Sequence, residues 1–150
     1  MEAWWAMLRR SWSSWWINFF KDLIATGKLD TSSTLQLECL WFCFGPVLKM
    51  ELEEIKESWN SHYVRKSRHY TQAGIPNQLY LLPETLGAED FKKEYDSQDL
   101  GEIEDSLALP TENDSPYQEY FSYNAGVLQL GQIHSWRDAL AAYECLLEVA

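Results

Sequence analysis

The 150-residue chain is 46% hydrophobic and 15% aromatic with eight Trp, a composition that excludes an intrinsically disordered polypeptide. Its net charge of −11 is unevenly distributed. Residues 1–83 hold nine basic and eight acidic residues, residues 84–119 hold two and twelve, and residues 120–150 hold one and three. The acidity therefore belongs to the middle of the chain, and the first half can still meet a polyanion.

The first helix is predicted over residues 2–26, because large apolar residues recur there at steps of three and four. These residues are Trp5, Leu8, Trp12, Trp15, Trp16, Phe19 and Leu23. Gly27 follows as a stop signal. With a uniform rotation of about 100° per residue, Glu2, Ala6, Arg9 and Ser13 share the face opposite much of this stripe.

A second helix is predicted from Ser33 to about Asn60, because Ser33 and Gln36 have the spacing of a capping box. Its apolar stripe again has the helical period. Pro46 lies inside it and predicts a kink or a break, since proline lacks the backbone N–H that the helix needs.

The remaining chain is less regular until its end. Residues 61–78 read as a basic loop with interleaved tyrosines, and a short apolar piece follows at residues 79–82. Residues 84–116 are acidic and rich in turn residues. A last helix is predicted over residues 135–149. We therefore divide the chain into a helical part (1–87), an acidic flexible segment (88–134) and a C-terminal helix (135–150).

The three cysteines follow no disulfide framework, and no signal peptide or long apolar run is present, so we expect an intracellular protein. Cys39 and Cys43 lie one helical turn apart, with His62 as the nearest further donor. A zinc site needs a fourth ligand that the sequence does not offer, so we expect buried thiols.

Several segments together resemble one protein family. Residues 2–5 read Glu-Ala-Trp-Trp, residues 15–22 read Trp-Trp-Ile-Asn-Phe-Phe-Lys-Asp, residues 57–62 read Glu-Ser-Trp-Asn-Ser-His, and residues 76–80 read Pro-Asn-Gln-Leu-Tyr. In this order they resemble the C-terminal part of a DDE-type integrase core domain, of the transposon-derived vertebrate integrase-core family, over residues 2–87. The resemblance implies a mainly α-helical chain, namely the C-terminal helices of an RNase H-like core without its β-sheet.

The resemblance also assigns roles to single residues. Glu2 matches the third carboxylate of the catalytic triad, which in an intact family member helps to hold Mg²⁺ for two-metal phosphoryl transfer. The two aspartates that complete the triad have no counterpart here. We therefore expect a truncated protein that is not an enzyme as it stands and binds no cofactor. Of the family's two basic positions after the glutamate, Arg9 is retained and Ala6 is not, and the neighbouring Arg10 could compensate.

Two functional hypotheses remain open. The first is nucleic-acid binding, linked by descent to DNA integration, through the basic residues Arg9, Arg10, Arg65, Lys66 and Arg68. The alternative is a helical protein–protein interaction module with an aromatic binding face that includes Trp12 and Trp16, through which the first helix could also self-associate. Attachment of that helix to a membrane is the weakest interpretation. A role near DNA favours a nuclear over a cytoplasmic location.

Overall fold

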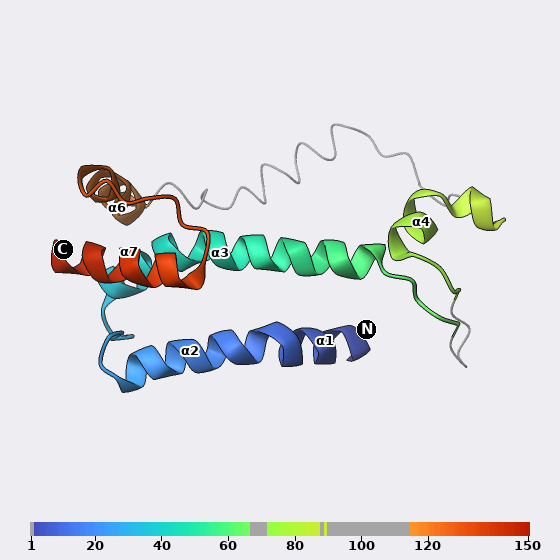
Figure 1. Ribbon diagram of the computed structural model, residues 1–150, viewed down its shortest axis with the longest axis horizontal. Helices are drawn as coiled ribbons and strands as arrows, with labels where there is room; N and C mark the ends of the chain where they lie inside the picture. The colour runs from blue at the N-terminus through green and yellow to red at the C-terminus, as the bar shows by residue number, and fades with distance from the viewer. Residues whose placement is uncertain (1, 67–71, 88, 90–114) are drawn as a thin grey trace, which may run out of the picture. The chain divides into compact units, whose positions relative to one another are not determined.

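The computed structural model describes residues 2–66, 72–87, 89 and 115–150, and their side chains from Trp4 onward. The helices are α1 (Glu2–Leu8), the π-helix η1 (Arg9–Ser13), α2 (Ser14–Ala25), α3 (Thr34–Ser61), α4 (Pro76–Leu81), the 3-10 helix η2 (Pro83–Leu86), α6 (Pro116–Val127) and α7 (Trp136–Glu148) (Figure 1). Within these ranges there is no β-strand, and a single β-bridge pairs Val64 with Gly74. The predicted mainly helical fold without a sheet is confirmed.

The chain forms two compact units. One unit comprises Met1–Glu51 and Glu112–Ala150, and the other comprises Leu52–Thr111. Helix α3 contributes its first part to one unit and its last part to the other. In the first unit, α2 and the beginning of α3 run antiparallel and are joined by a short turn (Figure 1).

The predicted first helix is confirmed. The uniform rotation of about 100° per residue that we assumed for it does not hold over Arg9–Ser13, where the chain forms a π-helix. Leu8 and Trp16 are both buried, at 7% and 3% exposure, although they are eight residues apart. Eight residues of a regular α-helix overshoot two turns by about 80°. The wider π turn absorbs one extra residue, which reduces this angular offset between Leu8 and Trp16.

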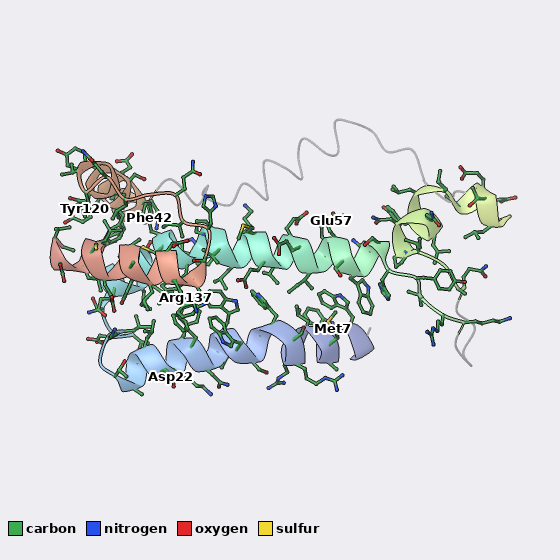
Figure 2. The ribbon with its side chains drawn as sticks, viewed as in Figure 1. Met7, Asp22, Phe42, Glu57, Tyr120 and Arg137 are labelled. Carbon is green, nitrogen blue, oxygen red and sulfur yellow. The ribbon has the colours of Figure 1, made fainter. Side chains whose placement is uncertain are left out.

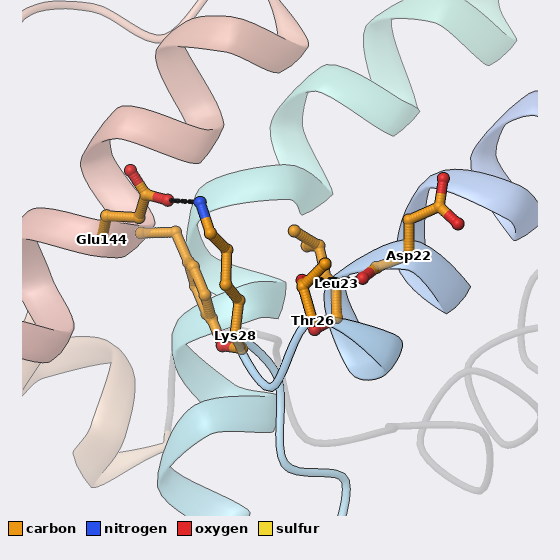
Figure 3. A network of polar contacts seen from close by, with 6 residues as sticks. Asp22, Leu23, Thr26, Lys28 and Glu144 are labelled. Carbon is orange, nitrogen blue, oxygen red and sulfur yellow. Dashed lines mark hydrogen bonds and ion pairs between the residues drawn. The ribbon is translucent and has the colours of Figure 1, made fainter.

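The turn after α2 is tied to the C-terminal helix. Gly27 ends the helix with φ of +72°, a left-handed conformation that glycine adopts without strain. Lys28 Nζ then pairs with Glu144 Oε1 at 2.6 Å (Figure 3), and the Tyr143 hydroxyl donates to the Lys28 carbonyl at 3.1 Å. A contact more than one hundred residues away along the sequence therefore holds this turn in place.

Helix α3 begins as predicted but passes through its proline. The Gln36 N–H donates to Ser33 Oγ at 3.4 Å, whereas the Gln36 side chain accepts from the Asp30 N–H, so only half of the capping box forms. Of the kink or break predicted at Pro46, the break is wrong, because the helix is continuous from Thr34 to Ser61. The buried Phe44 and Val47 on either side of Pro46 anchor successive turns in one core and thereby favour continuity.

Aromatic side chains dominate the core of the first unit. The Phe44 ring is fully buried, with its centroid 6.0 Å from that of Trp16 and 6.2 Å from that of Tyr143. Cys39 and Cys43 lie beside it as buried free thiols, as predicted. A hydrogen bond with Cys39, together with burial, raises the pKa of the Cys43 thiol well above its usual value. Both cysteines therefore act as small apolar core residues.

The two C-terminal helices close this core. Helix α7 was predicted, and its N-cap residue Ser135 accepts a hydrogen bond from the Asp138 N–H. Helix α6 lies within the segment that the sequence analysis assigned to flexible chain, and it was not predicted. Phe121 of α6 is fully buried, and its ring centroid lies 5.8 Å from that of Phe42. Residues 88 and 90–114 of that segment lie outside the described residues.

Candidate nucleic-acid interface

Arg9 and Arg10 lie side by side in the π-helical turn, and both are exposed. Arg10 Nε donates to the Ala6 carbonyl at 3.2 Å, while Arg9 makes no side-chain hydrogen bond to a described residue. Neither guanidinium forms an ion pair with any residue whose side chain is described. Glu2 is the first residue of α1, and its side chain lies outside the described part of the structure.

Two serine hydroxyls stabilise the π-helical turn from its outer side. Ser11 Oγ donates to the Met7 carbonyl at 2.8 Å, and Ser14 Oγ donates to the Arg9 carbonyl at 2.7 Å. The Ser14 N–H donates to the same Arg9 carbonyl, the bond to residue i−5 that defines a π-helix. The backbone of Arg9 is therefore held firmly while its guanidinium remains available to an anion.

A second basic group follows α3, in the other unit. The backbones of Val64 and Gly74 exchange two hydrogen bonds of 2.8 and 3.0 Å, which close the base of a loop. Arg65 and Lys66 follow Val64 in the sequence, and their side chains are exposed and form no ion pair with a described residue. Tyr63, which precedes Val64, is 64% exposed. Cations beside an exposed ring suit phosphates and unpaired bases.

The bridge depends on a glycine. Gly74 has φ of +153°, and a Cβ atom at this position would lie only 2.8 Å from Cδ2 of Leu79. Any side chain would therefore strain the backbone at this φ and would have to displace the Leu79 side chain of α4. Glycine at this position therefore favours the Val64–Gly74 bridge.

His62 and Arg68, also singled out from the sequence, have different outcomes. His62 Nδ1 pairs with the Trp59 carbonyl at the end of α3, and the two rings lie with centroids 4.6 Å apart. The His62 ring thus caps α3 instead of extending into the loop. Arg68 lies outside the described residues.

The described residues do not form the metal site of an intact integrase core. They contain no group of three or more His, Cys, Asp or Glu side chains placed to hold a metal ion. A two-metal centre needs several converging carboxylates.

The predicted aromatic binding face is largely internal. The indole N–H groups of Trp12 and Trp16 both donate to Glu51 Oε2, at 2.6 and 2.7 Å. Both tryptophans therefore contact α3. Trp16 is buried, so its predicted place in an exposed face is wrong, whereas Trp12 is half-buried. Trp5 and Trp15 remain 60% and 45% exposed. Glu51 was not predicted as a functional residue, because the sequence places it among the acidic residues on the solvated side of the second helix.

No helix in the described part of the chain is long and apolar enough to span a bilayer.

The fold and its surface define a helical protein with two exposed basic groups. Residues 1–87 match the family model described as "Integrase core domain". Since this match covers more than half of the 150 residues, the chain belongs to the integrase core domain family. Searches of curated proteins and of solved structures found no match.

Proposed function

We propose that this chain is a nucleic-acid-binding member of the integrase core family that does not catalyse strand transfer by itself. The observation that carries the proposal is that Arg9, Arg10, Arg65 and Lys66 are all exposed, with no ion pair to a described residue. Exposed cations that form no ion pair with a described residue are available to phosphate groups.

The proposed contact is to the phosphate backbone rather than to base edges. Two guanidinium groups on a single helical turn can bind neighbouring phosphates, since arginine forms paired hydrogen bonds with phosphate oxygens. Tyr63 next to Arg65 and Lys66 adds a ring on which an unpaired base can stack. The expected binding is therefore salt-dependent, weakly selective for sequence and stronger for single strands at the loop.

DNA binding by the purified 150-residue chain tests the proposal. We would measure fluorescence anisotropy of a labelled single-stranded and a labelled double-stranded oligonucleotide at several salt concentrations. The double variants R9A/R10A and R65A/K66A should each weaken binding and lower the log–log salt slope by about 2, since each phosphate contact contributes about 0.9.

The matched control is K21A/K49A, which removes two exposed cations of the first unit that lie outside both basic groups. It changes the net charge equally. If all three double variants weaken binding to the same extent, only net charge matters and the proposed interface is wrong. No salt-dependent binding by the unmodified chain would also refute the proposal.

The absence of catalysis is proposed from the family resemblance. Only Glu2 of these 150 residues matches a metal-binding carboxylate of the family, and one carboxylate cannot hold two divalent ions. A strand-transfer assay with Mg²⁺ or Mn²⁺ should give no product above background. Product that disappears in E2Q would show that the chain is an enzyme.

A second candidate function is supported by the exposed apolar residues of the first helix. Trp5 and Ile17 are 60% and 47% exposed, although both are large and apolar. Such residues favour self-association or a protein partner. Sedimentation velocity over a wide concentration range should show a dimer that W5S/I17S abolishes, and a monomer at every concentration would exclude self-association through this helix.

A nuclear location, proposed with the DNA role, is checked by imaging the tagged protein.

A further inference from the structure

A pocket of about 340 Å³ lies in the first unit, and neither Arg9 nor Arg10 is among its lining residues. Its lining combines four indole rings with one carboxylate. The lining residues are Ser11, Trp12, Trp15, Trp16, Glu51 and Trp136. They come from η1, α2, α3 and α7, so that the pocket exists only in the folded unit.

Glu51 occupies a defined position in this pocket. Its Oε2 atom accepts both indole N–H groups, from Trp12 at 2.6 Å and from Trp16 at 2.7 Å. Its Oε1 atom accepts no hydrogen bond from a described residue, and no described cation forms an ion pair with this carboxylate. A half-buried negative charge thus lies within an aromatic wall, without a cation from the described part of the chain to balance it.

The indole rings form a connected wall. The Trp15 centroid lies 4.9 Å from that of Trp16 and 5.5 Å from that of Trp136, and the Trp12 and Trp16 centroids are 6.4 Å apart. The Arg137 Cζ atom lies 4.8 Å from the Trp136 ring centroid, so one of these rings already binds a cation in this structure. Arg137 lies at the start of α7 (Figure 2) and is not among the lining residues.

We propose that this pocket binds a methylated ammonium group. Indole rings attract cations through their electron-rich faces, and aromatic cages of this kind recognise quaternary ammonium groups. The carboxylate of Glu51 supplies the complementary charge. The volume is at the low end for small-molecule pockets, which suits a compact head group.

The methylated form fits better than a primary ammonium for a physical reason. A primary ammonium brings three N–H donors, each of which needs an acceptor when it leaves water. The lining offers few, since Oε2 of Glu51 already accepts two indole donors. A trimethylammonium group has no N–H donor and loses little hydration on binding. The aromatic walls and the carboxylate are therefore sufficient to bind it, without further hydrogen-bond acceptors.

The test is a titration of the purified chain with tetramethylammonium chloride, followed by isothermal calorimetry and by tryptophan fluorescence. We expect saturable binding that is at least tenfold tighter than the binding of ammonium chloride. Choline is then compared with its neutral isostere 3,3-dimethylbutanol, which has the same shape without the charge. Equal binding of choline and the isostere, or no saturation with tetramethylammonium, overturns the proposal.

Two variants and two matched controls locate the site. E51Q keeps an oxygen that can accept the indole N–H groups but removes the charge, and W15L removes an exposed wall of the pocket. Each should weaken tetramethylammonium binding at least fivefold. The controls E148Q and W41L change exposed residues outside the lining and should bind normally. Normal binding by both E51Q and W15L refutes the site, and W15L alone decides the matter if E51Q fails to fold.

Two sources of the ligand are separated by further arms of the same experiment. One arm uses free choline, and the other uses a peptide with a single trimethyllysine alongside its unmodified form. The R9A/R10A and R65A/K66A variants should bind both ligands normally. The pocket and the nucleic-acid interface can therefore fail independently.

Discussion

Replacement of Glu51 by leucine removes the acceptor shared by two buried or half-buried indoles. Hydrogen bonds to a charged group contribute about 1.5–3 kcal/mol each, and a buried donor left unpaired loses about 1–3 kcal/mol. Trp16 is 3% exposed and cannot recover its bond from water, whereas the less buried Trp12 can do so in part. Burial of the leucine side chain offsets part of the loss. We therefore expect E51L to lower the free energy of unfolding by about 2–3 kcal/mol.

The assay is urea unfolding followed by far-UV circular dichroism, because substitutions next to Trp12 and Trp16 would change tryptophan fluorescence directly. E51Q, which keeps a neutral acceptor, should lose only about 1 kcal/mol. The matched control is E54L, the same change at an exposed position of the same helix, which should stay within about 0.5 kcal/mol of the unmodified chain.

If E51L and E54L change the unfolding midpoint equally, the indole hydrogen bonds to Glu51 do not stabilise the fold as expected. The same conclusion follows if E51Q is as unstable as E51L, since the retained oxygen would then stabilise nothing. A change in the denaturant dependence of E51L alone would show that the compactness of one state had changed, and the free energies would then be compared by hydrogen exchange.

Three other predictions concern positions elsewhere in the structure. F44A should lower the free energy of unfolding by about 3–5 kcal/mol, measured in urea, because Phe44 is fully buried among rings. The pKa of Asp138 is lowered chiefly by a hydrogen bond from Ser135, so its ionised form stabilises the fold at neutral pH, and this stabilisation is lost as pH falls through the lowered pKa. S135A should reduce that dependence below about pH 5, and an unchanged pH profile of the unfolding midpoint would contradict the assignment. G74A should break the bridge, because its Cβ would lie 2.8 Å from Leu79; faster hydrogen exchange of the Val64 amide detects this, and unaltered exchange excludes it.

The sequence by itself determined the features that depend on neighbours along the chain. The spacing of apolar residues at steps of three and four predicted the first and last helices, since the apolar face of a helix depends only on residues close together in the sequence. Ser33 predicted the start of α3, and Gly27 the end of α2, because caps involve only adjacent turns. The resemblance to an integrase core rested on ordered local segments, and the family match over residues 1–87 confirms it.

The exposed cations of the candidate interface were predictable in part. Arg9 was predicted on the face opposite much of the apolar stripe, with Arg10 beside it in the sequence, and Arg65 and Lys66 follow the end of a helix. Their exposure therefore needed only local information. The backbone that holds them was not predictable, because the π turn and the Val64–Gly74 bridge depend on packing and on chain segments that approach each other after folding.

The tertiary structure alone decided which distant residues meet. Pro46 predicted a break, yet buried neighbours on both sides favour continuity of the helix. Helix α6 has little helical periodicity and is stabilised by burial of Phe121, a contact that no local pattern specifies. Glu51 resembles any solvated helix acid until two indoles from another helix donate to it. In each case the deciding free energy comes from a contact between residues far apart in the chain, which spacing and propensity do not encode.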